Sequence, residues 1–252
     1  MRIFTISDIH VDYLENLKRI QSISAVDYKN DVLILAGDIS HKKSLLLNTV
    51  AGLRSKFKSV CFVPGNHDLW IHTDYNDSQE KFFDLMRLLP EEGIETNYFR
   101  LKGIQFLPIW AWYDNTFGIP EEKNIRIWAD FKRCKWSIPV SMLSEFFLNL
   151  NPPVTIDKND TVITFSHFLP RYDFLPKRLL THIDFILPFM GSRLIDEQIR
   201  QLKTHIHISG HLHFNFNTTV DNVQYINNAL GYPHERRINT DFLLELSWDE
   251  NV

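Results

Sequence analysis

The chain has 252 residues, of which 44% are hydrophobic and 23% charged, and its formal net charge at pH 7 is −4. These values are ordinary for a soluble globular protein, and they lack the basic excess expected of a chain that binds long nucleic acid. Its two cysteines exclude a disulfide framework and a thiolate zinc site, and no stretch approaches the ~18 apolar residues of a membrane span.

The N-terminal residues form too short an apolar run for a signal peptide and lead straight into Asp8. We therefore expect a cytoplasmic protein with no membrane partner. The length fits one large domain, and we expect a single domain over residues 1–252.

The first part of the chain alternates short apolar runs with amphipathic stretches. Runs rich in β-branched and other apolar residues predict strands at residues 3–6, 32–36 and 60–63. Stripes of apolar residues at helical spacing predict helices at residues 14–23, 44–57 and 77–89. Asp77 and Glu80 form a capping-box pattern at the start of the last helix. Alternating strands and helices indicate the α/β class.

The second part of the chain also contains short apolar runs that predict strands. Further strands are predicted at residues 104–109, 162–165, 206–208 and 242–246. Ser192 is a suitable cap for a helix that precedes the third of these. Two alternating runs, 214–220 and 223–226, predict a hairpin that turns at Asp221-Asn222. Residues 110–138 are rich in aromatic side chains and break the pattern, which predicts either an insertion packed over the main domain or a bulky part of its core.

Five short polar motifs each closely follow a predicted strand. In chain order they are Asp8-Ile9-His10, Gly37-Asp38, Gly65-Asn66-His67-Asp68, Ser166-His167 and Gly210-His211-Leu212-His213. In α/β sheets, ligands gather at the carboxyl ends of the strands, so we expect these five segments to converge on one crevice.

The residue types in these motifs are those that bind transition metals. Oxygen from Asp and Asn with nitrogen from His suits Mn, Fe or Zn better than Ca or a thiolate-bound ion. The motifs offer seven such side chains, more than one ion of this kind binds. We therefore expect two divalent metal ions, about 3.5–4 Å apart, with Asp38 as the natural bridging carboxylate after the middle strand.

At these residues the sequence resembles the calcineurin-like metallophosphoesterase superfamily, with motifs that span residues 8 to 213. The resemblance implies a four-layer α/β/β/α fold, in which a double β-sheet sandwich is flanked by helices. It assigns the first ion to Asp8, His10, Asp38 and His213. It assigns the second ion to Asp38, Asn66, His167 and His211. His67 would contact the substrate phosphate and protonate the leaving oxygen, with Asp68 orienting it.

Two differences from known subfamilies of this superfamily narrow the choice of subfamily. Ile39-Ser40-His41-Lys42 follows Gly37-Asp38, where serine/threonine protein phosphatases continue Val-Asp-Arg-Gly. No tyrosine occupies the place of the metal-bound tyrosine of purple acid phosphatases. The resemblance therefore favours a small bacterial-type phosphodiesterase or phosphatase.

The expected activity is hydrolysis of a phosphate mono- or diester by a metal-bridging hydroxide, on a small phosphorylated molecule such as a nucleotide. Asn66 and Arg171 are expected to contact the substrate. A nuclease of the same superfamily is an alternative that the acidic net charge disfavours, so a nucleic-acid partner is not favoured. A non-catalytic scaffold is a second alternative, and the complete ligand set with His67 argues against it.

Overall fold

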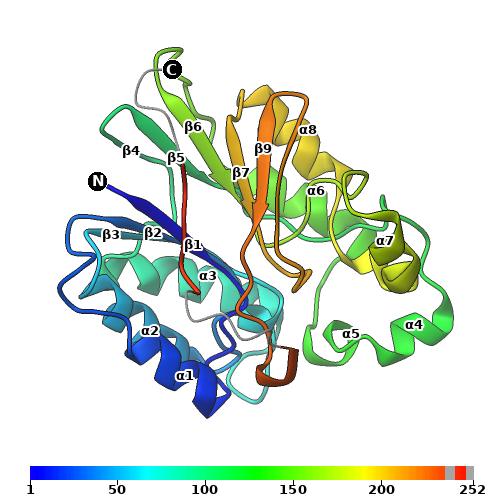
Figure 1. The fold of residues 1–252 in the computed structure, drawn as a ribbon. Helices are drawn as coiled ribbons and strands as arrows, with labels where there is room; N and C mark the ends of the chain where they lie inside the picture. Colours follow the sequence, from blue (N-terminus) through cyan, green and yellow to red (C-terminus); the bar gives the residue numbers. More distant parts are fainter. Residues whose placement is uncertain (236–241, 248–252) are drawn as a thin grey trace.

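A computed structural model of the chain describes residues 1–235 and 242–247. Its strands form two sheets (Figure 1). The first has the order β10-β1-β2-β3, with β10 (Leu244–Glu245), β1 (Ile3–Ile6), β2 (Val32–Ala36) and β3 (Ser59–Val63). The second has the order β4-β5-β6-β7-β9-β8, with β4 (Phe99–Leu101), β5 (Ile104–Pro108), β6 (Thr161–Phe165), β7 (Ile206–Ser209), β9 (Val223–Asn227) and β8 (Phe216–Val220). Only the edge strands β10, β4 and β8 pair antiparallel among these described strands.

The two sheets pack face to face through alternate residues of their strands. Ile34 and Ala36 of β2 belong to the same buried cluster as Phe106 of β5 and Ile163 of β6. Leu33, from the opposite face of β2, belongs to a separate cluster that the helices share. This alternation is the period-two pattern of a strand covered on both faces. The predicted double-sheet sandwich is confirmed.

Helices flank both sheets. Figure 1 shows α1, α2 and α3 beside the first sheet and α6 and α8 beside the second. The described helices are α1 (Leu14–Gln21), α2 (Lys43–Arg54), α3 (Ser78–Leu88), α4 (Glu122–Ile127), α5 (Asp130–Arg133), α6 (Val140–Leu150), α7 (Lys177–Ile183) and α8 (Arg193–Gln201). None of the helices in the described ranges has the length and apolar character needed to cross a bilayer.

Local sequence signals explain several of these elements. Asp77 caps α3 by accepting a hydrogen bond from the backbone N–H of Glu80 at 2.8 Å, as the capping-box pattern predicts. Ser192 caps α8 in the same way through the N–H of Leu194. Asp221 and Asn222 both have positive φ, 50° and 64°, so the β8–β9 hairpin has the primed type of turn that matches strand twist.

Candidate metal centre

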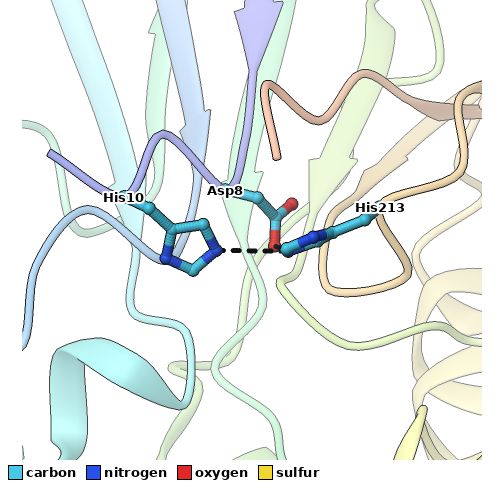
Figure 2. Close-up of side chains that lie close together, drawn as sticks. All are labelled: Asp8, His10 and His213. Atoms are coloured by element: carbon cyan, nitrogen blue, oxygen red, sulfur yellow. Dashed lines mark hydrogen bonds and ion pairs between the residues drawn. The ribbon is translucent and has the colours of Figure 1, made fainter. Parts of the chain in front are cut away.

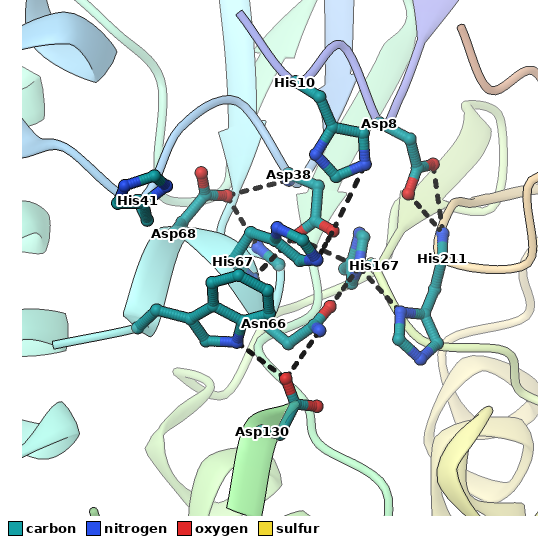
Figure 3. Close-up of polar contacts among 12 residues, drawn as sticks. Asp8, His10, Asp38, His41, Asn66, His67, Asp68, Asp130, His167 and His211 are labelled. Carbon is teal, nitrogen blue, oxygen red and sulfur yellow. Dashed lines mark hydrogen bonds and ion pairs between the residues drawn. The ribbon is translucent and has the colours of Figure 1, made fainter. Parts of the chain in front are cut away.

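The predicted metal-binding motifs meet where five strands end. The loops after β1, β2, β3, β6 and β7 bring their polar side chains together at one edge of the two sheets (Figure 3). The loop backbones are held to one another: Asp8 N–H donates to the Gly37 carbonyl and His10 N–H to the Asp38 carbonyl, both at 3.0 Å. The expected convergence of the five motif segments at one edge of the sheets is therefore present.

The backbone at this edge is strained. Five of the predicted metal ligands have left-handed φ values: Asp8 52°, His10 37°, Asp38 58°, His211 69° and His213 55°. A non-glycine residue pays about 1–3 kcal/mol for such a conformation, which persists only where surrounding structure enforces it. Strain of this kind clusters at functional sites.

Two glycines let the loops approach closely. Gly37 has a φ of 84°, and a Cβ there would overlap Nδ1 of His167. A Cβ on Gly65 would overlap Oδ1 of Asp38 and the His167 ring. The glycines in the Gly-Asp and Gly-Asn-His-Asp motifs are thus required by packing against the polar side chains.

Asp8, His10 and His213 form a first cluster (Figure 2). Nε2 of His213 lies 3.1 Å from Nε2 of His10 and 3.1 Å from Oδ1 of Asp8. Nδ1 of His213 lies 2.7 Å from a carboxylate oxygen of Glu235. Burial opposes a charge on His213, but the Asp8 carboxylate and then Glu235 outweigh it and raise its pKa to about 10. This cluster therefore favours a positive charge between the three side chains.

His167, His211 and Asn66 form a second cluster (Figure 3). His167 Nδ1 lies 2.8 Å from the Ala36 carbonyl and His211 Nε2 lies 3.1 Å from the Phe189 carbonyl, so these nitrogens carry the ring protons. The other nitrogens, Nε2 of His167 and Nδ1 of His211, then face each other at 3.2 Å with lone pairs only.

A third acceptor, Oδ1 of Asn66, lies 3.1 Å from Nε2 of His167. Burial lowers the pKa of both His167 and His211, so an added proton between them is disfavoured. Three inward-facing acceptors without a proton suit a metal cation, and nitrogen with amide oxygen is a donor set for Mn, Fe or Zn.

Asp38 lies between the two clusters. Its Oδ1 is 3.5 Å from Nε2 of His167, and its Oδ2 is 3.9 Å from Nε2 of His10. Burial and the neighbouring Asp8 carboxylate raise the pKa of Asp38 well above its usual range, so the ionised form needs a counter-charge. One oxygen toward each cluster is the arrangement that a carboxylate bridging two cations requires.

His67 is held from two sides. Its ring stacks on Trp70 at 3.6 Å between centroids, and its Nε2 lies 3.3 Å from the hydroxyl of Tyr232. The same nitrogen is 3.8 Å from Oδ2 of Asp38. Burial keeps the pKa of His67 well below its usual range. His67 is therefore a neutral ring in a fixed position beside Oδ2 of Asp38.

Asp68 is bonded to the backbone of the loops that carry the site. Its Oδ2 accepts hydrogen bonds from the backbone N–H groups of Asp38 and Gly65, and its Oδ1 accepts from those of Ile39 and Ser40, at 2.8–3.0 Å. Both oxygens are thus taken by backbone donors, and burial raises the pKa of Asp68 to about 6 in spite of them. Asp68 therefore holds the loop that carries Asp38, and its expected role in orienting His67 stays a prediction.

Replacing Asp68 with Asn is expected to lower the free energy of unfolding by about 2–5 kcal/mol, because the amide turns its N–H₂ group toward two backbone donors that are left unsatisfied. Urea denaturation in the presence of a chelator measures this loss. D77N is the matched control, because Asn caps a helix as well as Asp does. Equal stability of D68N and the wild type would contradict this role.

Arg171 lies outside the clusters. It forms ion pairs with Asp173 at 2.5 Å and with Asp221 at 3.0 Å, and its guanidinium lies over the ring of Tyr225. Asp221 belongs to the turn that precedes β9, whereas the site lies at the carboxyl ends of the strands. Arg171 therefore belongs to a surface ion-pair network, and its expected contact with substrate stays a prediction.

Three residues at the site were not identified from the sequence. Glu235 contacts His213, Tyr232 contacts His67, and Asp130 accepts a hydrogen bond from the side-chain amide of Asn66 at 2.8 Å. Asp130 comes from the aromatic-rich stretch 110–138, and the other two follow β9. None of them stands in a motif of metal-binding spacing. Only the aromatic density around Asp130 distinguishes its neighbourhood in the sequence.

Comparison with known proteins agrees with this geometry. Residues 1–215 match the model of the calcineurin-like phosphoesterase family, and the chain belongs to that family. It is therefore a hydrolase of phosphoester bonds, as predicted, and its family implies divalent metal cofactors.

Two comparisons concern one relative. The chain is 26% identical over 262 residues to the acyl-carrier-protein phosphodiesterase PptH of Mycobacterium tuberculosis, covering 93% of this chain and 79% of the relative. The crystal structure of phosphopantetheinyl hydrolase PptH from the same organism superimposes with a TM-score of 0.71 at 23% identity, covering 98% of this chain and 96% of the other. The latter likeness supports the fold.

Proposed function

We propose that the chain is a phosphodiesterase that binds two divalent cations on either side of Asp38. The first cation would be held by Asp8, His10, Asp38 and His213, and the second by Asp38, Asn66, His167 and His211. The observation that supports this most is the pair of unprotonated nitrogens, Nε2 of His167 and Nδ1 of His211, which face each other at 3.2 Å. Two such lone pairs repel each other unless a cation lies between them.

When bound, such a pair of ions would lower the pKa of a coordinated water and neutralise charge on a phosphate. The side chains of the protein would supply the remaining functions. His67 would donate to a phosphoryl oxygen, and the stacked Trp70 keeps His67 in place. A phosphate anion beside the ring would raise the low pKa of His67, which would let it protonate the leaving oxygen.

We propose a phosphodiester on a phosphopantetheinyl carrier protein as the substrate class. The support is the relative over 93% of this chain, an acyl-carrier-protein phosphodiesterase. The metal would be Mn, Fe or Zn, because the donors are imidazole, carboxylate and amide groups without a thiolate.

A substrate panel tests this function. The metal-free protein, reloaded with Mn²⁺, Fe²⁺ or Zn²⁺, would be assayed on bis-nitrophenyl phosphate, mononitrophenyl phosphate, cyclic nucleotides, single-stranded DNA and a phosphopantetheinyl acyl carrier protein. We expect metal-dependent cleavage of bis-nitrophenyl phosphate and of the phosphopantetheinyl acyl carrier protein, with the carrier protein preferred. Cleavage of the monoester or the DNA at a higher kcat/KM would overturn the proposed substrate class.

A further inference from the structure

Asp130 is a buried carboxylate surrounded by hydrogen-bond donors. It is 3% exposed and stands at the start of the short helix α5. Its Oδ1 accepts from the Asn66 amide at 2.8 Å and from the Trp70 indole N–H at 2.7 Å. Its Oδ2 accepts from the Trp128 indole N–H at 2.9 Å and lies 3.2 Å from the Tyr113 hydroxyl. Figure 3 shows Asp130 beneath Asn66, on the side away from Asp38.

The contact with Asn66 decides which end of that amide faces the second cluster. Nε2 of His167 carries a lone pair, so an isolated Asn66 would turn its N–H₂ group toward that nitrogen. The turn would place the amide oxygen against Oδ1 of Asp130, where two acceptors repel. Asp130 therefore holds the oxygen of Asn66 toward the proposed cation.

The contact with Trp70 links the same oxygen to His67. The Trp70 ring stacks on His67 at 3.6 Å, and its N–H is fixed by Oδ1 of Asp130. Oδ1 of Asp130 thus sets the orientation of two side chains. One is Asn66, a proposed metal ligand, and the other is Trp70, whose ring supports His67, the proposed acid. Fixing both through one atom is a stronger constraint than packing alone provides.

We infer that Asp130 is a positioning residue for the phosphoesterase reaction, and that it is the means by which the aromatic segment 110–138 serves the site. This inference rests on the proposed two-cation function. Asp130 need not touch a cation or a substrate. It acts by holding Asn66 in its metal-binding orientation and Trp70 against His67.

Substitution of Asp130 tests the inference. D130A frees the Asn66 amide. We therefore expect one of the two Mn²⁺ ions to bind about 10- to 100-fold more weakly, which is the typical loss when the hydrogen-bond partner of a metal ligand is removed. We also expect a lower kcat. D130N keeps one oxygen that both Asn66 and Trp70 can share, and we expect it to recover most of the affinity and turnover. Titration calorimetry of the metal-free protein with Mn²⁺ measures affinity apart from activity.

Asp114 provides the matched control. It is a buried carboxylate in the same segment, and it accepts from Thr116 and from the Ser192 hydroxyl without contacting a site residue. D114A is expected to lose stability while both Mn²⁺ affinities stay at their wild-type values. W70F, which keeps an aromatic ring and removes the indole N–H, should lower kcat and leave Mn²⁺ binding unchanged.

The outcomes separate the inference from the proposed function. Wild-type affinities and kcat in D130A would overturn the role of Asp130 alone. Should D130A fail to fold, an unchanged kcat in W70F would overturn that role. Wild-type protein that binds no Mn²⁺ would overturn the two-cation function and the role of Asp130 with it.

Discussion

Replacing Asp38 with Asn is expected to reduce kcat/KM by about 10³-fold, on the estimate that a lost bridging carboxylate removes about 4 kcal/mol of the stabilisation that two cations give a transition state. Asp38 is the residue with one oxygen toward each cluster, at 3.5 Å from His167 and 3.9 Å from His10. An amide of the same shape offers one neutral oxygen in place of two charged ones. Steady-state kinetics with bis-nitrophenyl phosphate and a Mn²⁺ titration measure both consequences.

Asp31 supplies the control for this substitution. It is also buried, and it pairs with Arg2 at 2.6 Å at the opposite end of β1 and β2. D31N is expected to bind two Mn²⁺ ions and to turn over at the wild-type rate, even though it loses stability. If D38N bound two ions with wild-type affinity and kept its kcat/KM, Asp38 would not bridge them.

Replacing His67 with Ala is expected to lower kcat by about 10²- to 10⁴-fold on a diester with a poor leaving group, because proton donation to that group is lost. Both Mn²⁺ ions should still bind, since His67 belongs to neither of the two proposed ligand sets. The loss should shrink on a nitrophenyl ester, whose leaving group needs little protonation. Comparing kcat on alkyl and nitrophenyl diesters measures the difference.

His182 is a suitable control for this experiment. It lies on the exposed face of α7, where its Nδ1 lies 2.6 Å from the Arg178 carbonyl. H182A is expected to leave both rates unchanged. Full turnover of H67A on an alkyl diester would rule out the acid role of His67.

Most of the fold could be predicted from local sequence. The strand runs fall within a residue or two of β1, β2, β3, β5, β6 and β7, because each is an apolar run and all but β5 are closed by a glycine or a polar motif. The hairpin was predictable because Asp and Asn tolerate positive φ. Strand β4 and helices α4, α5, α6 and α7 were not predicted. Strand β4 is a three-residue edge strand, and α4, α5 and α7 are short, with 6, 4 and 7 residues. Helix α6 begins after Pro139 and carries apolar residues on several faces.

The candidate site was predictable only for residues that stand in motifs. Asp8, Asp38 and His211 each follow a strand, so the packing of the two sheets brings these strand ends together. Asp68 also follows a strand, but it lies in a 3-10 turn that points its carboxylate at backbone N–H groups, which its motif does not encode. Single acidic residues such as Asp130 and Glu235 reach the site through distant segments, and their spacing carries no signal.

Diffraction from crystals soaked in Mn²⁺, with anomalous maps at the manganese edge, tests the central claim most directly. We predict two peaks on opposite sides of the Asp38 carboxylate, about 3.5–4 Å apart, one among Asp8, His10 and His213 and one among Asn66, His167 and His211. A single peak, or peaks remote from Asp38, would contradict a twin cation centre.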